Sequence, residues 1–123
     1  MAFQDTRRGD IWFANDGMGP RDDASHATYG NRPVVVVSSN RTSAGMPVIT
    51  VVPLTSSPKK LETVEDYPTR VLLNPMDGPT VTSVAMTEQV TSVDRADLDH
   101  FINTVSPEAM RRIDAALKAH LGF

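Results

Sequence analysis

Runs of apolar residues divide this chain into short strands followed by one amphipathic helix. Val34 to Val37 is an uninterrupted β-branched run, which is typical of a strand buried on both faces. A second apolar run, Val48 to Leu54, follows after the turn-forming stretch Asn40 to Gly45. The two runs are therefore predicted to pair as an antiparallel hairpin over residues 32–54.

Shorter apolar runs predict the other strands. They span residues 9–14, 70–73, 81–86 and 90–93. The polar stretches 15–31 and 55–68 contain glycine or proline, and we expect both to be loops. Asp94 is a good cap, which predicts a short helix reaching to about Phe101.

The last segment of the chain is a predicted helix. Ser106 suits the N-cap and Pro107 the first helical position, and Gly122 follows the end of the apolar pattern. Its apolar stripe at helical spacing consists of Met110, Ile113, Leu117 and Leu121. Strands first and a helix last indicate an α+β chain that is mainly β. We expect one domain, residues 1–123, built as a small, strongly bent antiparallel sheet or barrel with the helix packed on it.

Composition narrows the class of protein. The chain has no cysteine, which excludes disulfides and thiolate metal sites and favours a reducing, cytoplasmic compartment. We expect neither secretion nor membrane insertion, because no apolar segment resembles a signal peptide or a membrane span. The net charge of −3 argues against a surface coated in positive charge for duplex binding. The three histidines lack metal-ligand spacing, so no metal or cofactor is predicted.

The predicted hairpin carries the candidate chemistry. Arg32 stands where the first apolar run begins, and Thr55 stands where the second one ends. In an antiparallel hairpin these two positions lie side by side at one edge of the sheet. A guanidinium and a hydroxyl at that edge are suited to binding a phosphate.

Several motifs together resemble the MazF/PemK family, the toxin halves of bacterial toxin–antitoxin pairs. They occur in the family's order and cover nearly the whole chain: Arg8-Gly9-Asp10-Ile11-Trp12, Gly30-x-Arg32-Pro33 with the valine run to Ser38, Pro53-Leu54-Thr55-Ser56, Ser83-Val84-Ala85-Met86-x-Glu88-Gln89-Val90 and the terminal helix. The resemblance implies an SH3-like or CcdB-like barrel that forms a homodimer. It also implies a metal-independent, sequence-specific endoribonuclease for single-stranded RNA such as mRNA, silenced by a cognate antitoxin protein.

The resemblance also assigns roles to four residues. Arg32 matches the family's catalytic arginine, and Thr55 matches its catalytic or phosphate-binding threonine. Either His26 or Glu88 is expected to act as the general acid or base, since each falls where some members carry a residue of that kind. Further RNA contacts are expected from Ser56, Arg41, Lys59, Lys60 and Gln89.

Two other classes of function compete with the nuclease. A CcdB-like toxin on the same barrel would poison DNA gyrase by protein contact, without catalysis. An SH3-like adaptor would bind peptides, but aromatic residues make up only 6% of the chain, and peptide grooves of that kind are lined with them. The pairing of Arg32 and Thr55 favours the nuclease.

Overall fold

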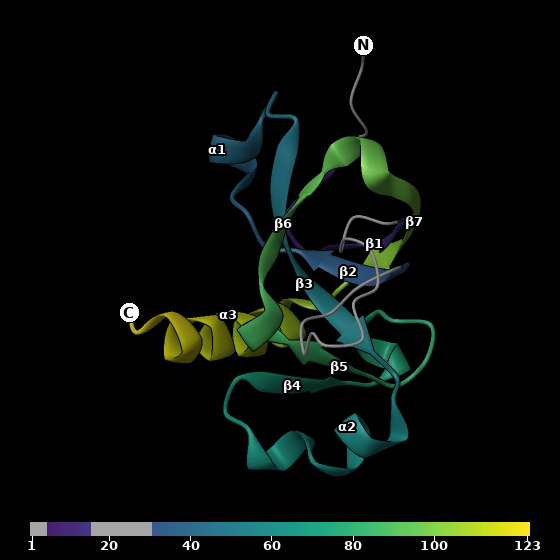
Figure 1. Ribbon diagram of the computed structural model, residues 1–123, viewed down its shortest axis with the longest axis vertical. Helices are drawn as coiled ribbons and strands as arrows, with labels where there is room; N and C mark the ends of the chain where they lie inside the picture. Colours follow the sequence, from purple (N-terminus) through teal and green to yellow (C-terminus); the bar gives the residue numbers. More distant parts are fainter. Residues whose placement is uncertain (1–4, 16–30) are drawn as a thin grey trace, which may run out of the picture.

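A computed structural model describes residues 5–15 and 31–123 of the chain (Figure 1). Seven strands form a bent antiparallel sheet in the order β4-β5-β3-β2-β1-β7, and β6 pairs with β3 outside that path. The strands are β1 (Asp10–Ala14), β2 (Arg32–Val36), β3 (Val48–Thr55), β4 (Arg70–Leu73), β5 (Ser83–Met86), β6 (Thr91–Asp94) and β7 (Leu98–Thr104). The α-helices are α1 (Asn40–Ser43), α2 (Pro58–Glu62) and α3 (Pro107–Leu121), and short 3-10 turns are η1 (Val64–Asp66), η2 (Pro75–Asp77), η3 (Thr87–Gln89) and η4 (Arg95–Asp97). The mainly β architecture with a C-terminal helix is as predicted.

The central hairpin is confirmed. β2 and β3 run antiparallel with Val34 opposite Pro53 and Val36 opposite Val51. The valines of β2 are buried, as expected for a strand that is covered on both faces. The turn-forming residues between the strands form the short helix α1, whose N-cap Ser39 accepts a hydrogen bond from Arg41 N at 3.2 Å.

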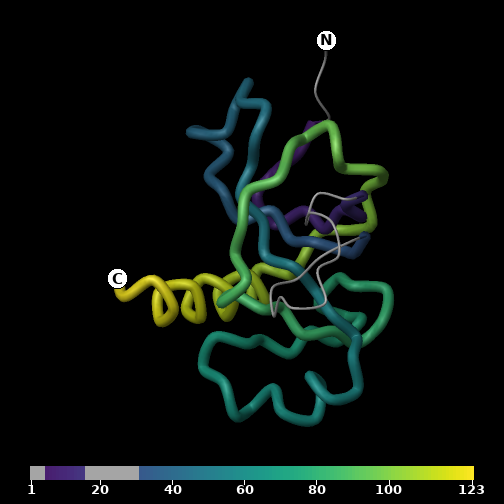
Figure 2. The backbone as a smooth tube through the Cα atoms, in the orientation of Figure 1, coloured from purple at the N-terminus to yellow at the C-terminus, as the bar shows by residue number. Residues whose placement is uncertain are grey.

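The other edge of β3 is shared by two strands. Its first half, Val48 to Val51, pairs with β6, and its last two residues pair with β5. The turn η3 lies between these two partners, in the gap between the predicted strands 81–86 and 90–93. In Figure 2 the chain accordingly passes from the lower part of the molecule, which holds β4 and β5, to the upper part, which β6 and β7 close.

Side chains on the two faces of the sheet form separate clusters. One face packs against α3, with Ile11, Val35, Leu54 and Leu73 against Ala109 and Ile113. The opposite face forms the interior of the barrel, lined by Trp12, Ala14, Val34, Val36, Ile49, Val51, Val93 and Leu98. Where that same face continues onto β5, it is covered by Leu61 and Val64. The sheet is therefore buried on both faces along most of its length.

The predicted helix that follows Asp94 is wrong. Asp94 ends β6, η4 follows, and residues 98–104 form β7, which pairs with β1. Aromatic contacts stabilise this pairing: Trp12 meets Phe101 edge to face at 5.8 Å, and Phe13 stacks on His100 at 5.4 Å. Cross-strand packing thus outweighs the local capping signal.

The predicted loop over residues 55–68 is also wrong in part. It contains α2 and η1, which begin and end within the polar stretch. Pro58 occupies the first turn of α2, where its missing N–H costs nothing. Leu61 and Val64 are three residues apart, and both pack on Val84 and Met86 of β5. This apolar pair is the signal that the polar composition obscured.

The terminal helix is confirmed with its caps. Ser106 Oγ accepts from Ala109 N at 3.1 Å, and Gly122 ends the helix in the left-handed conformation, φ 81°. The buried stripe differs slightly from the prediction, because Ala109 and Ala116 flank Ile113 in the core whereas Leu121 is 51% exposed. None of the helices within residues 5–15 and 31–123 has the length and the apolar character that a membrane span requires.

Gly78 is predicted to be the least replaceable of the described glycines. Its φ is 134°, and a Cβ there would lie 2.9 Å from Thr104 O. Gly45 is the matched control, because its φ is also positive, 74°, but a Cβ there meets nothing within 4 Å. We expect Gly78→Ala to lower the free energy of unfolding by roughly 1–3 kcal/mol more than Gly45→Ala, measured by urea denaturation. Equal losses would contradict the close approach at Gly78.

Candidate functional site

Arg32 and Thr55 meet at the open end of the hairpin. Continuing the β2–β3 register by two pairs beyond Val34 and Pro53 places Arg32 opposite Thr55. Arg32 Nη1 donates to the backbone oxygen of Leu54 at 3.3 Å, so its side chain reaches across the end of β3. Both residues lie on the sheet face that α3 does not cover. The juxtaposition predicted from the sequence is therefore present.

The hydroxyl of Thr55 is oriented by the chain that follows it. Its Oγ1 accepts a hydrogen bond from Ser57 N at 3.2 Å, where the strand turns into α2. A hydroxyl that accepts one hydrogen bond still carries its own proton. Thr55 can therefore donate to an oxygen of a bound anion while the turn holds its side chain in place.

Glu88 lies in η3 and is bound to β4. Its Oε1 accepts from Thr69 Oγ1 at 3.0 Å, and its Oε2 pairs with Arg70 Nε at 2.8 Å. The side chains of Arg70 and Glu88 are 13% and 22% exposed, so this ion pair is largely shielded from solvent. Arg70 also lies over the Tyr67 ring, 3.9 Å from its centroid.

Sequence reasoning missed Tyr67 and Arg70. Arg70 faces Met86 across the β4–β5 ladder, and Glu88 follows two residues later in the chain. The interacting positions are 18 residues apart, and their meeting depends on the β4–β5 register. In the sequence, the only signal is an aromatic residue three positions before a strand-opening arginine.

The expected RNA-contacting residues are divided between two regions. Ser56 follows Thr55 directly, and Lys59 and Lys60 lie one turn further on in α2. Arg41 is on α1, which precedes the start of β3, and the eight residues of β3 span about 23 Å from that end to Thr55. Gln89 lies in η3 beside Glu88. His26 lies outside the described residues.

The two histidines of the described residues, His100 and His120, lie on β7 and α3. His100 belongs to β7, whereas the sequence suggested a helix there. Its Nδ1 is 2.7 Å from Asp99 Oδ2. The hydrogen bond from His100 lowers the pKa of Asp99, and a second one from Asn15 acts in the same direction. Within residues 5–15 and 31–123, no group of three histidines or carboxylates could hold a metal ion.

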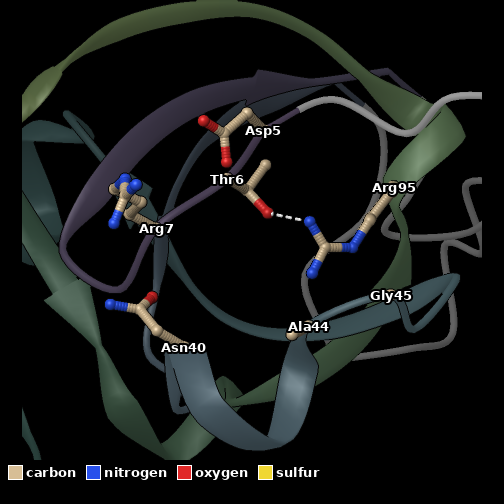
Figure 3. Close-up of a pocket in the computed structure, with 7 residues that line it drawn as sticks. All are labelled: Asp5, Thr6, Arg7, Asn40, Ala44, Gly45 and Arg95. Carbon is tan, nitrogen blue, oxygen red and sulfur yellow. Dashed lines mark hydrogen bonds between the residues drawn. The ribbon is translucent and has the colours of Figure 1, made fainter.

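A separate hollow of about 450 Å³ lies around Arg95, near the start of β3 (Figure 3). Arg95 is 6% exposed, and its guanidinium donates to Ser43 O at 2.6 Å, to Met46 O at 2.7 Å and to Thr6 Oγ1. These bonds join η4 to the α1–β3 connection and to the N-terminal segment. The lining residues are Asp5, Thr6, Arg7, Asn40, Ala44, Gly45 and Arg95. Arg95 therefore acts as a structural anchor, at the opposite end of β3 from Thr55.

Comparison with known proteins gives consistent matches over the length of the chain. A model of the family described as PemK-like, MazF-like toxin of type II toxin–antitoxin system matches residues 7–121. Endoribonuclease MazF9 of Mycobacterium tuberculosis is 37% identical over 121 residues, which are 94% of this chain and 95% of that protein.

Solved structures share the fold. MazF from Deinococcus radiodurans aligns with a TM-score of 0.76 and 22% identity, covering 96% of this chain and 97% of its own. A mycobacterial endoribonuclease in complex with its cognate antitoxin aligns with a TM-score of 0.71 and 22% identity, covering 98% and 96%. The family match over the whole described sheet favours a toxin over a peptide-binding adaptor.

Proposed function

Because the chain belongs to the PemK-like, MazF-like toxins of type II toxin–antitoxin systems, we propose that it is an endoribonuclease that cuts single-stranded RNA at specific sequences. The observation that carries this proposal is the meeting of Arg32 and Thr55 at one edge of the sheet. The printed name of the mycobacterial relative, an endoribonuclease, agrees with it. The substrate would be mRNA in the cytoplasm, and its cleavage would stop translation.

The proposed reaction uses the ribose 2′-OH as the nucleophile. Its oxygen bonds to phosphorus, the P–O5′ bond breaks, and the products are a 2′,3′-cyclic phosphate and a 5′-hydroxyl. Arg32 would stabilise the charge on the transition state, because a guanidinium is permanently protonated and forms two parallel hydrogen bonds to phosphate. Thr55 would donate to a non-bridging oxygen.

Two protons move in this reaction. One leaves the 2′-OH for a general base, and one is delivered to the departing O5′ by a general acid. Glu88 or His26 is proposed for this work. Each carboxylate oxygen of Glu88 accepts one hydrogen bond, from Thr69 or from Arg70, and has a second lone pair for a hydroxyl proton.

The proposed partners are RNA, a second copy of the chain and an antitoxin. One solved structure of the same fold contains a cognate antitoxin. A homodimer would double the number of cations around the groove, which helps a chain of net charge −3 attract RNA. An acidic, partly disordered antitoxin segment would compete for that groove.

Cleavage is expected to continue in EDTA, because a guanidinium supplies the positive charge that a metal ion supplies in other nucleases. The measurement is gel analysis of a long single-stranded RNA, with and without the chelator. RNA with a 2′-deoxy nucleotide at the cut position should resist cleavage, since it lacks the nucleophile. Activity that needs added magnesium, or an unchanged rate on the deoxy substrate, would refute the internal attack.

Arg32→Ala is expected to slow cleavage by about 10²–10³, the usual effect of removing one preorganised donor. Thr55→Val, nearly isosteric, should cost about 1.5–3 kcal/mol in transition-state stabilisation, the value of a hydrogen bond to a charged group. Arg111→Ala is the control, because it removes an exposed charge on α3. If Arg32→Ala and Thr55→Val melt and cut as the parent does, the site is elsewhere.

RNA affinity should fall steeply with salt, because phosphate contacts release condensed cations. Light scattering should give about twice the chain mass, and fluorescence titration should show several-fold weaker RNA binding at physiological than at low salt. A monomer that cuts RNA at full rate with no salt dependence would contradict the dimeric groove.

A further inference from the structure

We propose that Tyr67, Arg70 and Glu88 form a subsite that reads a guanine base next to the cleaved phosphodiester, an inference that rests on the proposed function. The ligand is defined by its chemistry. It is an unpaired base with two adjacent acceptors on one edge, as O6 and N7 of guanine provide. The three residues come from the segment before β4, from β4 itself and from η3.

Arg70 is held rigidly before any ligand arrives. Its Nε is 2.8 Å from Glu88 Oε2, and its guanidinium carbon lies 3.9 Å from the centre of the Tyr67 ring. Glu88 is fixed in turn by Thr69 Oγ1 at 3.0 Å. The side chain of Arg70 is only 13% exposed. A ligand therefore does not have to immobilise a mobile arginine, which is the usual entropic cost of such a contact.

The end of the guanidinium remains available. Nε is used by Glu88, whereas Nη1 and Nη2 of Arg70 form no hydrogen bond with residues 5–15 or 31–123. These two nitrogens form the fork that binds a pair of acceptors bidentately. Phosphate and guanine both offer such a pair, so geometry alone does not decide between them.

Charge decides in favour of the base. Glu88 compensates the positive charge of Arg70 at 2.8 Å, which weakens attraction to a phosphate but leaves the directed N–H donors intact. Tyr67 is 45% exposed, so part of its surface remains open beside Arg70 for a base to stack on. A guanidinium whose charge is compensated by Glu88, next to an exposed ring, matches a nucleobase better than it matches a phosphate.

The register places the subsite close to the Arg32–Thr55 pair. Arg70 is opposite Met86, and Thr55 is opposite Val84, so both point to the face of the sheet that α3 does not cover. Two strand spacings and two residues along the strand separate Arg70 from Thr55, about 12 Å between Cα atoms. The separation means that a base bound at Arg70 flanks the cleaved nucleotide. In Figure 1 the two positions correspond to the start of β4 and the end of β3.

The test compares base preferences on a randomised single-stranded RNA pool, by sequencing the molecules cut and, separately, the molecules retained by the protein. The parent should prefer guanine at one flanking position by roughly 5- to 150-fold. Arg70→Lys and Arg70→Gln should lose that preference and keep all others. Arg111→Gln, which removes an exposed charge on α3, should keep every preference.

The RNA side of the test does not depend on how the variants fold. Replacing the preferred guanine by 7-deazaguanine removes N7 and should weaken binding to the parent about as much as Arg70→Lys does. Inosine keeps O6 and N7 and should bind as guanine does. If 7-deazaguanine binds as well as guanine, or if folded Arg70 variants keep the parent profile, the subsite is refuted.

The remaining outcomes separate this inference from the proposed function. If Arg70→Gln loses affinity equally for all sequences while Arg70→Lys retains it, Arg70 contacts phosphate and the base assignment is wrong. A parent that retains RNA with the guanine preference but never cuts it would refute the nuclease and support the subsite. A parent that cuts RNA with a base preference that the Arg70 variants leave unchanged would refute the subsite and support the nuclease. A parent with no affinity for RNA would refute both.

Discussion

The edge of β3 that faces away from β2 determines the arrangement of the whole molecule. A single strand there must satisfy the hydrogen bonds of two different partners, β6 along Val48 to Val51 and β5 at Leu54 and Thr55. The chain changes from one partner to the other through η3. Backbone groups buried in a sheet have to be paired, so this change of partner is possible only where a short turn can leave the strand ladder. The change of partner closes the barrel on the side of β6, whereas β4 and β5 extend from the other side.

This change of partner positions the chemistry as well as the fold. Thr55 lies in the short β5-paired end of β3, beyond the part of that sheet face that lines the barrel interior. Glu88 lies in η3, between the paired residues of β5 and β6, and its carboxylate reaches across to Arg70 of β4. Arg32 and Thr55 depend on the hairpin register, whereas Glu88 and Arg70 depend on the change of partner.

That division explains which features the sequence could predict. The β2–β3 hairpin and α3 follow from local patterns, a continuous valine run and a capped amphipathic stripe, so Arg32 and Thr55 could be placed together. β7 could not be predicted, because its pairing with β1 depends on contacts such as Trp12 with Phe101, formed between distant segments. The Arg70–Glu88 pair depends in the same way on the register of β4 against β5, which no local pattern specifies.

The two arginines of this face differ in the groups that hold them, and we propose different tasks for them in RNA cleavage. Arg70 is neutralised by a carboxylate at 2.8 Å, so what remains is the direction of its N–H groups, which suits discrimination between bases. Arg32 instead reaches across the end of β3 to the backbone oxygen of Leu54, which brings its guanidinium to the sheet edge that carries Thr55, where we propose that it stabilises the transition state. In a chain of net charge −3, we expect the local arrangement of cations to decide where RNA would bind more than the net charge does.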